Sequence, residues 1–202
     1  MITSTTDQTA GLLRVVLTGL APVVGAITPE QWHDPTPCQA FDVEQLRDHV
    51  LGWLTNFAAG FADPHGQAPR ADNDGFHAPA GADAAAAQVS TAADRLDRAI
   101  GDGGAARPLR LGENAMPGDL ALGMILWEYQ VHGWDLARAT GQEWSVPVAA
   151  AEASLTFVPT MLGPDHQGEG KPFGKPVQVP DGAPTLDRLI ALSGRDPGWA
   201  GA

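Results

Sequence analysis

The segment 120–137 is the part of this 202-residue chain that most constrains its fold. It reads LALGMILWEYQVHGWDLA, and it is apolar on most of its circumference when it is wound as a helix. A helix that is apolar nearly all round is buried on most sides, so other helices are expected to surround it. The breaker Pro117-Gly118 precedes the segment and Gly141 follows it, which predicts a helix from about 119 to 140.

Three further segments carry apolar residues at the three- and four-residue spacing of a helix. They cover about 12–27, 43–61 and 83–100. In the first, Pro22 is expected to kink the helix or end it early, because proline lacks an amide hydrogen. The second has an explicit start, with Asp42 as N-cap and Gln45 three residues later for a capping box. Four such helices predict an all-α fold, most simply a four-helix bundle.

Stretches rich in glycine and proline separate these helices and end the chain. The remaining expected elements are loops at 62–82 and 101–117, a short extended piece at 109–111, and helices at about 147–162 and 185–193. We expect residues 1–162 to form the bundle and residues 163–202 to form a C-terminal extension packed on it.

Charge and cysteine content exclude several classes of protein. With 24 acidic and 12 basic side chains the formal charge is −12, which argues against nucleic acid or an anionic membrane as partner. One cysteine cannot form an internal disulfide, so a disulfide-held secreted scaffold is excluded and a cytoplasmic location is expected. The longest strongly apolar run, 120–127, is far shorter than the ~20 residues of a membrane span. The first helix lacks the basic start of a signal peptide.

Polar side chains interrupt the apolar surface of the 119–140 helix along one stripe. Glu128 and His132 are four residues apart, and Asp135 follows three residues later, so all three share a face. An ionised glutamate buried there needs a partner, because an unpaired buried charge costs several kcal/mol. Side chains at this spacing lie roughly 5–6 Å apart and can hold the same ion.

A third ligand is expected from a facing helix, because two protein ligands make a weak site. His49 lies one turn from Leu46 and Trp53, at the edge of the apolar face of the second predicted helix. With Glu128 and His132 it makes a His₂Glu set, the three-ligand arrangement of a catalytic zinc with an open fourth position. Spacing alone leaves open that the Glu128–His132 pair is a surface or core hydrogen bond, and that His49 is a half-buried interface histidine.

Three motifs occur in order along the chain. They are TPCQAFDV at 36–43 followed by Leu46 and His49, EYQVHGWDLARATG at 128–141, and a tail with FGKPVQVP at 173–180 and GRDP at 194–197. Together they resemble the DinB/YfiT-like metal-binding family, in the subgroup related to the N-terminal domain of mycothiol-dependent maleylpyruvate isomerase. The resemblance covers nearly the whole chain.

The resemblance implies a DinB-like bundle that binds a divalent metal, zinc or nickel. In that family the ligands are a histidine of the second helix and a Glu-x-x-x-His of the fourth, which correspond to His49, Glu128 and His132. It also implies an enzyme, a transferase or isomerase, that uses a low-molecular-weight thiol such as mycothiol against an electrophile. A metal that lowers the pKa of its ligand can hold a thiolate near neutral pH, and the thiolate is the nucleophile.

The chain also departs from the pattern of the family. Phe41 stands where tryptophan is usual, and the isomerase's second domain, which helps to hold its dicarboxylate substrate, has no equivalent of that size here. No clear counterpart of the isomerase's substrate arginine is found, although Arg70, Arg107 and Arg110 lie in loops that could reach a pocket. Isomerisation of maleylpyruvate is therefore not the expected reaction.

Two residues near the predicted ligands have competing interpretations. Asp135 either accepts a hydrogen bond from a ligand histidine or forms a salt bridge with Arg138 or Arg47. Cys38 is interpreted as a small buried residue rather than a nucleophile. Residues expected to have no role in the site are the packing residues Trp127 and Trp134 and the solvated histidines His33, His65, His77 and His166.

Two other functions stay open beside a metal-dependent thiol transferase. The scaffold could serve as a non-catalytic module that binds a metal or a small molecule. Alternatively, the polar cluster is only a hydrogen-bonded core network in a protein whose main role is pairing as a homodimer.

Overall fold

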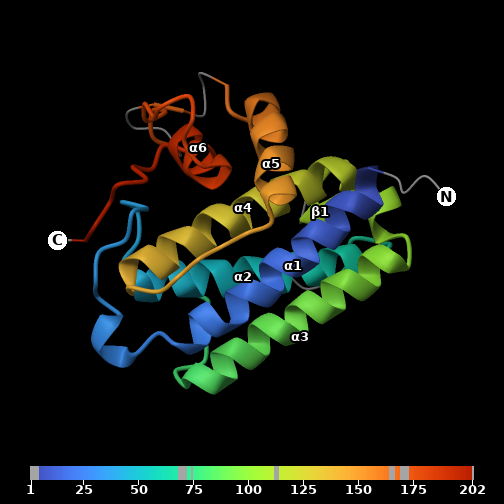
Figure 1. Ribbon diagram of the computed structural model, residues 1–202. Helices are drawn as coiled ribbons and strands as arrows, with labels where there is room; N and C mark the ends of the chain where they lie inside the picture. Colours follow the sequence, from blue (N-terminus) through green and yellow to red (C-terminus); the bar gives the residue numbers. More distant parts are fainter. Residues whose placement is uncertain are drawn as a thin grey trace.

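Four long helices form the body of the protein in the computed structural model, which describes residues 5–67, 72–73, 75–111, 114–163, 167–168 and 173–201. They are α1 (Thr5–Gly25), α2 (Val43–Ala62), α3 (Ala82–Gly101) and α4 (Gly118–Ala139). Both α1 and α2 pack against α3 and α4 (Figure 1). One continuous cluster of buried apolar side chains fills the space between the helices. The predicted all-α, DinB-like bundle is therefore confirmed.

Local sequence signals account for where these helices begin and how far they run. At the start of α2, Asp42 Oδ1 accepts a hydrogen bond from Gln45 N (2.9 Å) and Gln45 Oε1 accepts one from Asp42 N (3.0 Å), which is the predicted capping box. Pro22 does not end α1, which continues beyond it to Gly25, and the kink expected as the alternative stays a prediction. The two valines that follow Pro22 are buried against the core, and this packing outweighs the single backbone hydrogen bond that proline removes.

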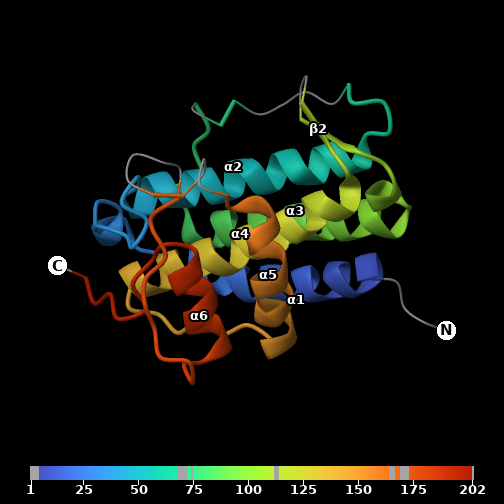
Figure 2. The ribbon, with the colours of Figure 1, turned by 90° about the horizontal axis from the view of Figure 1, so that it is seen from above.

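A short β-hairpin lies beside α2. Its strands β1 (Leu109–Leu111) and β2 (Asn114–Met116) pair antiparallel, with Leu109 opposite Met116. Figure 2 shows the hairpin over the C-terminal half of α2. A methyl group added at Gly60 of α2 would lie 2.8 Å from the Leu109 side chain, so strand and helix are in close contact. The extended piece was predicted but its partner strand was not, because three residues are too few for a periodic signal.

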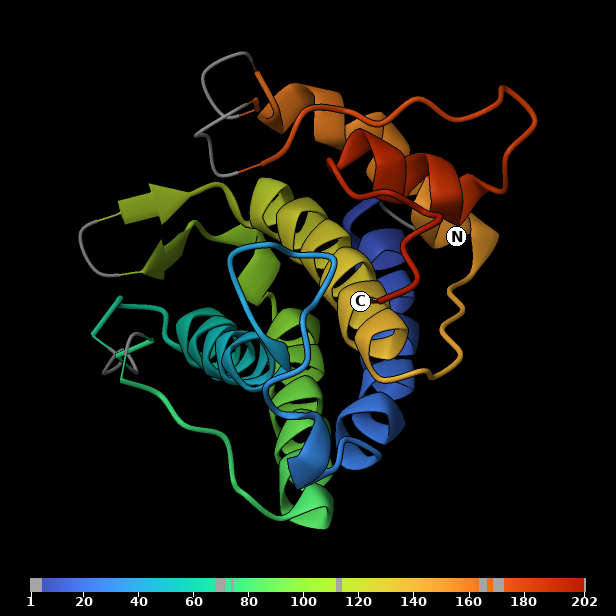
Figure 3. The ribbon, with the colours of Figure 1, turned by 90° about the vertical axis from the view of Figure 1, so that its left-hand side faces the viewer.

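The C-terminal part adds α5 (Val148–Met161) and α6 (Thr185–Leu192), close to their predicted bounds. Helix α5 packs on both α4 and α6 (Figure 3). A second buried cluster joins Trp127 and Trp134 of α4 to apolar side chains of α6, and Trp127 Nε1 donates a hydrogen bond to Ser193 Oγ at 2.8 Å. Both tryptophans are packing residues, as expected. The boundary at residue 162 stays a prediction, since α5 contacts elements on both sides of it.

Two short 3₁₀ helices, η1 (Pro29–Gln31) and η2 (Gly104–Ala106), lie between the long helices. By length and composition α1 also meets the criteria for a membrane-spanning helix. The core helix of a soluble protein and a signal sequence meet the same criteria, so meeting these criteria does not show a membrane location. In this fold α1 packs along α3 and α4.

Candidate metal centre

His49 lies in the N-terminal half of α2, beside the face that this helix buries. That face carries Leu46 and Phe57, and position 49 falls at its edge. The His49 ring lies 4.9 Å from the ring of Phe41 and 6.5 Å from that of Trp53, measured between centroids. Its side chain is 24 % exposed. Aromatic rings on two sides therefore hold the imidazole at the point where the helix surface passes from core to solvent.

Helix α4 presents the other predicted residues on a single stripe. Glu128, His132 and Asp135 follow one another along this stripe, because steps of four and three residues each return close to the same face. Burial increases along it, since the side chains are 22 %, 10 % and 0 % exposed in that order. Glu128 is therefore the member nearest to solvent, and Asp135 lies fully in the interior.

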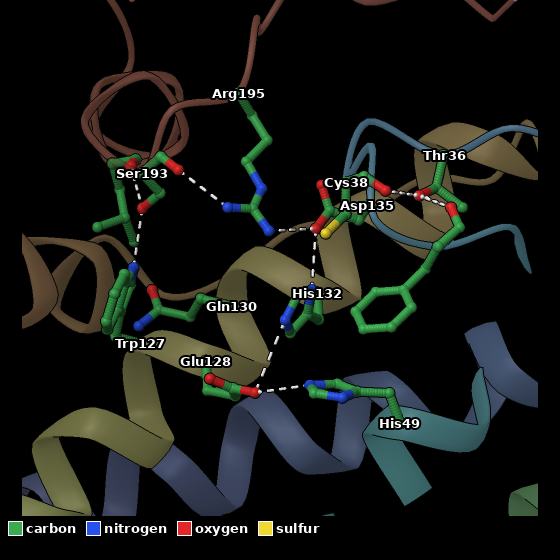
Figure 4. Close-up of polar contacts among 12 residues, drawn as sticks. Thr36, Cys38, His49, Trp127, Glu128, Gln130, His132, Asp135, Ser193 and Arg195 are labelled. Atoms are coloured by element: carbon green, nitrogen blue, oxygen red, sulfur yellow. Dashed lines mark hydrogen bonds and ion pairs between the residues drawn. The ribbon is translucent and has the colours of Figure 1, made fainter. Parts of the chain in front are cut away.

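The three predicted ligands converge, although two helices far apart in the sequence supply them (Figure 4). His49 Nε2 lies 3.3 Å from Glu128 Oε1, and His132 Nε2 lies 3.6 Å from the same oxygen. The two imidazole rings meet edge to face with centroids 5.3 Å apart. One nitrogen of each histidine and one oxygen of Glu128 all lie within 4.8 Å of one another.

These separations fit the coordination shell of one small divalent ion. Nitrogen and oxygen ligands lie about 2.0–2.2 Å from zinc, so two of them in a tetrahedral shell are about 3.4 Å apart. The two measured distances to Glu128 Oε1, 3.3 and 3.6 Å, bracket that value. Two imidazole nitrogens with one carboxylate oxygen also suit zinc and nickel better than magnesium or calcium, which prefer oxygen donors.

The surroundings of Glu128 favour its anionic form. Burial raises the pKa of this carboxyl group, but the hydrogen bond with His49 and the charge interaction with His132 lower it by more. The resulting pKa lies below that of an ordinary glutamate. The carboxylate is therefore ionised at neutral pH, as a metal ligand must be.

A second carboxylate fixes the orientation of His132. Asp135 Oδ2 lies 3.0 Å from His132 Nδ1, and because a carboxylate only accepts hydrogen bonds, the proton resides on Nδ1. A neutral ring with its proton on Nδ1 presents the lone pair of Nε2 on the side of Glu128, which is the tautomer that a metal ligand needs. Of the two interpretations of Asp135, the hydrogen bond to a predicted ligand is present.

A residue that the sequence analysis did not assign to the site balances the charge of Asp135. Arg195, which follows α6, donates to Asp135 Oδ2 at 3.2 Å and to Ser193 O at 2.9 Å. Burial lowers the pKa of Arg195, but the charge of Asp135 and other nearby anionic groups raise it by more, so the guanidinium stays charged. The C-terminal segment therefore reaches the residue that orients His132.

The arginines first considered as partners of Asp135 have other contacts. Arg138 donates to a backbone carbonyl near the C-terminus at 2.9 Å, and the guanidinium of Arg47 lies 5.1 Å from the ring centroid of Trp32. A salt bridge was thus expected correctly, but with the wrong partner. The only sequence signal for Arg195 was its place in the GRDP motif, because pairing across 60 residues leaves no trace in local spacing.

Cys38 lies beside the same histidine without the features of a nucleophile. Its sulfur lies within 4.8 Å of one atom each of His132 and Asp135. The thiol is half-buried, and burial is the main cause that raises its pKa above the ordinary value. The Thr36 hydroxyl holds the surrounding turn, because it is shared between the carbonyls of Cys38 (2.9 Å) and Phe41 (2.8 Å). A neutral thiol in such a turn fits the expected packing role.

A cavity of about 360 Å³ opens beside the candidate ligands, between α2, α4 and the hairpin. His49 and Glu128 line it on one side. The other lining residues are one alanine and six larger apolar side chains, Trp53, Phe57, Leu109, Leu111, Met116 and Met124. A pocket of this size is suited to a small molecule.

The arginines considered for a substrate role are placed differently from one another. Arg110 points away from the cavity, because it alternates along β1 with the two leucines that line it, and its side chain packs against Gly66. Arg107 lines a separate hollow at the end of α2. Arg70 lies outside the described residues. The described lining of the cavity beside the candidate ligands therefore contains no basic residue apart from His49.

The histidines expected to be solvated are found at the surface where the structure describes them. The side chains of His33 and His77 are 82 % and 83 % exposed, and His65 is exposed as well. His166 lies outside the described residues. None of the three that are described belongs to a group that could hold a metal.

Fold and site together define a class of protein, namely an all-α bundle in which a histidine of the second long helix faces a Glu-x-x-x-His of the fourth. This chain belongs to the mycothiol maleylpyruvate isomerase N-terminal domain family, which matches residues 13–137, and this domain is DinB-like. The family resemblance expected from the motifs is thereby confirmed. The matched region contains all three candidate ligands and Asp135, whereas Arg195 lies beyond it.

The chain is also similar to two uncharacterized proteins from two strains of Mycobacterium tuberculosis. Each is 33 % identical to it over 175 residues, which cover 87 % of this chain and 91 % of the relative. No solved structure matches the chain significantly. The likeness to these relatives therefore extends over more residues than the family region.

Proposed function

We propose that this protein binds a divalent metal through His49, Glu128 and His132 and transfers a low-molecular-weight thiol, such as mycothiol, to an electrophilic small molecule. Zinc is the preferred metal and nickel the alternative. The observation that carries the proposal is the approach of three suitable donor atoms to within 4.8 Å of one another. Membership of a family described by a mycothiol-dependent isomerase supports the choice of thiol.

The chemistry follows from the donor set and its surroundings. When bound, a divalent ion supplies a Lewis acid that lowers the pKa of a thiol ligand, so that a thiolate persists near neutral pH. Glu128 contributes an ionised oxygen, and Asp135 keeps the proton of His132 on Nδ1. In the transfer, the thiol sulfur forms a bond to an electrophilic carbon, the leaving group departs with the electron pair of the broken bond, and the thiol proton passes to solvent.

The cavity supports catalysis over a purely structural role for the polar cluster. Three protein donors leave a coordination position for an external ligand, and about 360 Å³ of space adjoins two of the donors. A hydrogen-bonded core network needs no such opening. A metal site with space for a second reactant has the parts that a bimolecular transfer requires.

Metal content tests the ligand assignment. Wild-type protein loaded with zinc and then desalted is expected to retain about one equivalent, while His132→Ala retains a small fraction, because three-ligand sites depend on each donor. Elemental analysis of both proteins gives the measurement. His65→Ala, which removes an exposed histidine, is the matched control and is expected to retain zinc like the wild type. Equal zinc in His132→Ala and wild type would refute the assignment.

Thiol consumption tests the reaction itself. Zinc-loaded wild type is expected to accelerate the loss of mycothiol in the presence of an alkylating electrophile, and His132→Ala is expected to lose this acceleration. Metal retention without turnover of mycothiol, bacillithiol or any other low-molecular-weight thiol would instead assign the protein as a metal-binding module.

The proposal includes a cytoplasmic location and small-molecule partners. A single cysteine needs no oxidising compartment, and a formal charge of −12 disfavours nucleic acid. Pairing as a homodimer through an exposed helix face stays a prediction.

A further inference from the structure

The lining of the cavity beside the candidate ligands is polar at the end near these ligands and apolar farther from them. Its polar lining residues His49 and Glu128 face each other across α2 and α4. Along α2 the lining continues one turn at a time to Trp53 and then Phe57, and along α4 it continues to Met124. Among the described residues, moving away from the ligands therefore brings only apolar side chains into contact with the cavity.

The hairpin closes the apolar end. Leu109 and Leu111 line the cavity from β1, and Met116 lies opposite Leu109 on β2. Because side chains alternate along a strand, Arg110 points to the other face, where it packs against Gly66. The register of the hairpin thus turns Leu109, Leu111 and Met116 inward and Arg110 outward, while Ala115, opposite Arg110, also lines the cavity.

Aromatic and sulfur-containing side chains make this wall suitable for a flat ligand. The rings of Trp53 and Phe57 are stacked, with centroids 5.4 Å apart and planes 27° apart. Met116 and Met124 supply flexible thioethers, which adapt to a ligand and make favourable contacts with aromatic rings. An aromatic or alkyl group can therefore be buried here with good contacts on several sides.

We infer, on the basis of the proposed function, that the electrophile has an aromatic or alkyl body that carries no charge away from its reactive end. The body lies among Trp53, Phe57 and the hairpin, and the reactive carbon lies near His49 and Glu128. An ionised group within the body would be taken out of water against walls whose described residues are apolar and include no cation, which is unfavourable. The cavity volume of about 360 Å³ limits the electrophile to a small molecule.

Two single-ring ligands of similar shape, one charged at both ends and one uncharged, test this inference without any turnover. Terephthalate carries a carboxylate at each end of its ring, and dimethyl terephthalate carries an uncharged ester at each end. Whichever end of terephthalate lies at the candidate ligands, the other carboxylate must enter the apolar part. We expect zinc-loaded protein to bind the ester about tenfold or more tightly than the acid in ligand-observed NMR titrations. Equal affinities, tighter binding of the acid, or no binding of the ester would each overturn the inference.

A cation placed in the apolar wall is expected to reverse this preference. Met124→Lys is expected to strengthen binding of terephthalate about tenfold and to weaken binding of the ester. Met161→Lys makes the same change at the end of α5, outside the cavity, and is expected to leave both affinities as in wild type. Met116→Lys on the hairpin is a second variant, in case the change in α4 impairs folding. An unchanged preference in both cavity variants would place the ligands elsewhere and overturn the inference.

Zinc content measured on the same samples separates this inference from the proposed function. Protein that retains zinc but shows no preference for the ester contradicts only the inference about the electrophile. Protein that prefers the ester but retains no zinc contradicts the proposed function, and with it the assignment of the bound molecule as an electrophile.

Discussion

The residues of α4 around His132 either contact its imidazole ring or leave space for packing against the helix. Its two ring nitrogens face two different carboxylates, Asp135 on the buried side and Glu128 on the side of the cavity. The next residue, Gly133, has no side chain, and the indole of Trp144 occupies the space that a Cβ would take. Trp144 Nε1 also donates to a backbone carbonyl of α4 at 3.1 Å. The missing side chain therefore lets the chain after α4 fold back closely onto the helix that carries the candidate site.

Replacing Gly133 by alanine tests this packing. Alanine favours a helix by about 1 kcal/mol over glycine, but its methyl group would overlap the ring of Trp144, and such overpacking costs about 1–3 kcal/mol. We expect Gly133→Ala to lower or at best leave unchanged the free energy of unfolding measured with urea. Gly11→Ala in α1 is the matched control, because nothing lies within 4 Å of its added methyl group. It is expected to stabilise the protein by about 0.5–1 kcal/mol. A stabilised Gly133→Ala protein would show that Trp144 does not lie against α4.

The end of α6 and the residues after it reach the group that orients a candidate ligand. Trp127 of α4 donates a hydrogen bond to Ser193, and the backbone carbonyl of Ser193 in turn accepts one from Arg195. Arg195 pairs with Asp135, which holds His132. The C-terminal extension is therefore connected to a candidate ligand through an unbroken series of contacts, and it does more than cover α4.

Removing the arginine at the end of this series is expected to affect both stability and metal binding. Arg195→Ala leaves the fully buried carboxylate of Asp135 without a cation, which costs about 3–5 kcal/mol. It also loosens the group that orients a candidate ligand, so zinc affinity is expected to fall about 10–100-fold. Urea unfolding and zinc titration give the two measurements. Arg138→Ala, at an exposed arginine that contacts the same C-terminal segment, is expected to change stability by about 0.5 kcal/mol or less.

A double variant separates charge from packing in this prediction. Arg195→Ala combined with Asp135→Asn removes the buried charge itself, so part of the lost stability is expected to return while zinc affinity stays low. If Arg195→Ala binds zinc as tightly as wild type, the arginine does not act through His132.

In the part of the chain that the structure describes, two buried clusters meet along α4. The larger lies between the four long helices, and the smaller lies between α4, α5 and α6. The candidate metal centre bridges α2 and α4, and the buried hydroxyl of Tyr129 joins the same two helices through a hydrogen bond to Val50 O at 3.2 Å. A metal held across these helices would bind the folded chain and not the unfolded one, so it would stabilise the entire fold.

Metal removal is expected to lower the thermal stability of the whole domain. At a free zinc concentration of about 100 times its dissociation constant, binding adds about 2.7 kcal/mol, which corresponds to about 5–10 °C in Tm for a domain of this size. Thermal unfolding with zinc and with a chelator gives the measurement. His49→Ala is expected to have the same Tm in both conditions, and magnesium is expected to have little effect on wild type. An equal zinc-dependent shift in His49→Ala would show that zinc acts elsewhere.

Local physical rules in the sequence account for much of the fold and part of the site. The repeat of 3.6 residues predicts the long helices from their apolar spacing and places Glu128, His132 and Asp135 on one stripe of α4. The capping box before α2 depends only on residues three positions apart, and the structure contains it. All of these features arise within one or two helical turns, where the covalent chain alone brings the groups together.

The tertiary structure decided what no local repeat encodes. The packing of α2 against α4 determines the distance between His49 and Glu128. The packing of the C-terminal residues on α4 places Arg195, and not an arginine nearer in the sequence, beside Asp135. Pairing of two three-residue strands turned Leu109 inward and so made the wall of the cavity apolar. These contacts join residues dozens of positions apart, and their geometry depends on the packing of the whole core. A single segment therefore carries too little information to specify them.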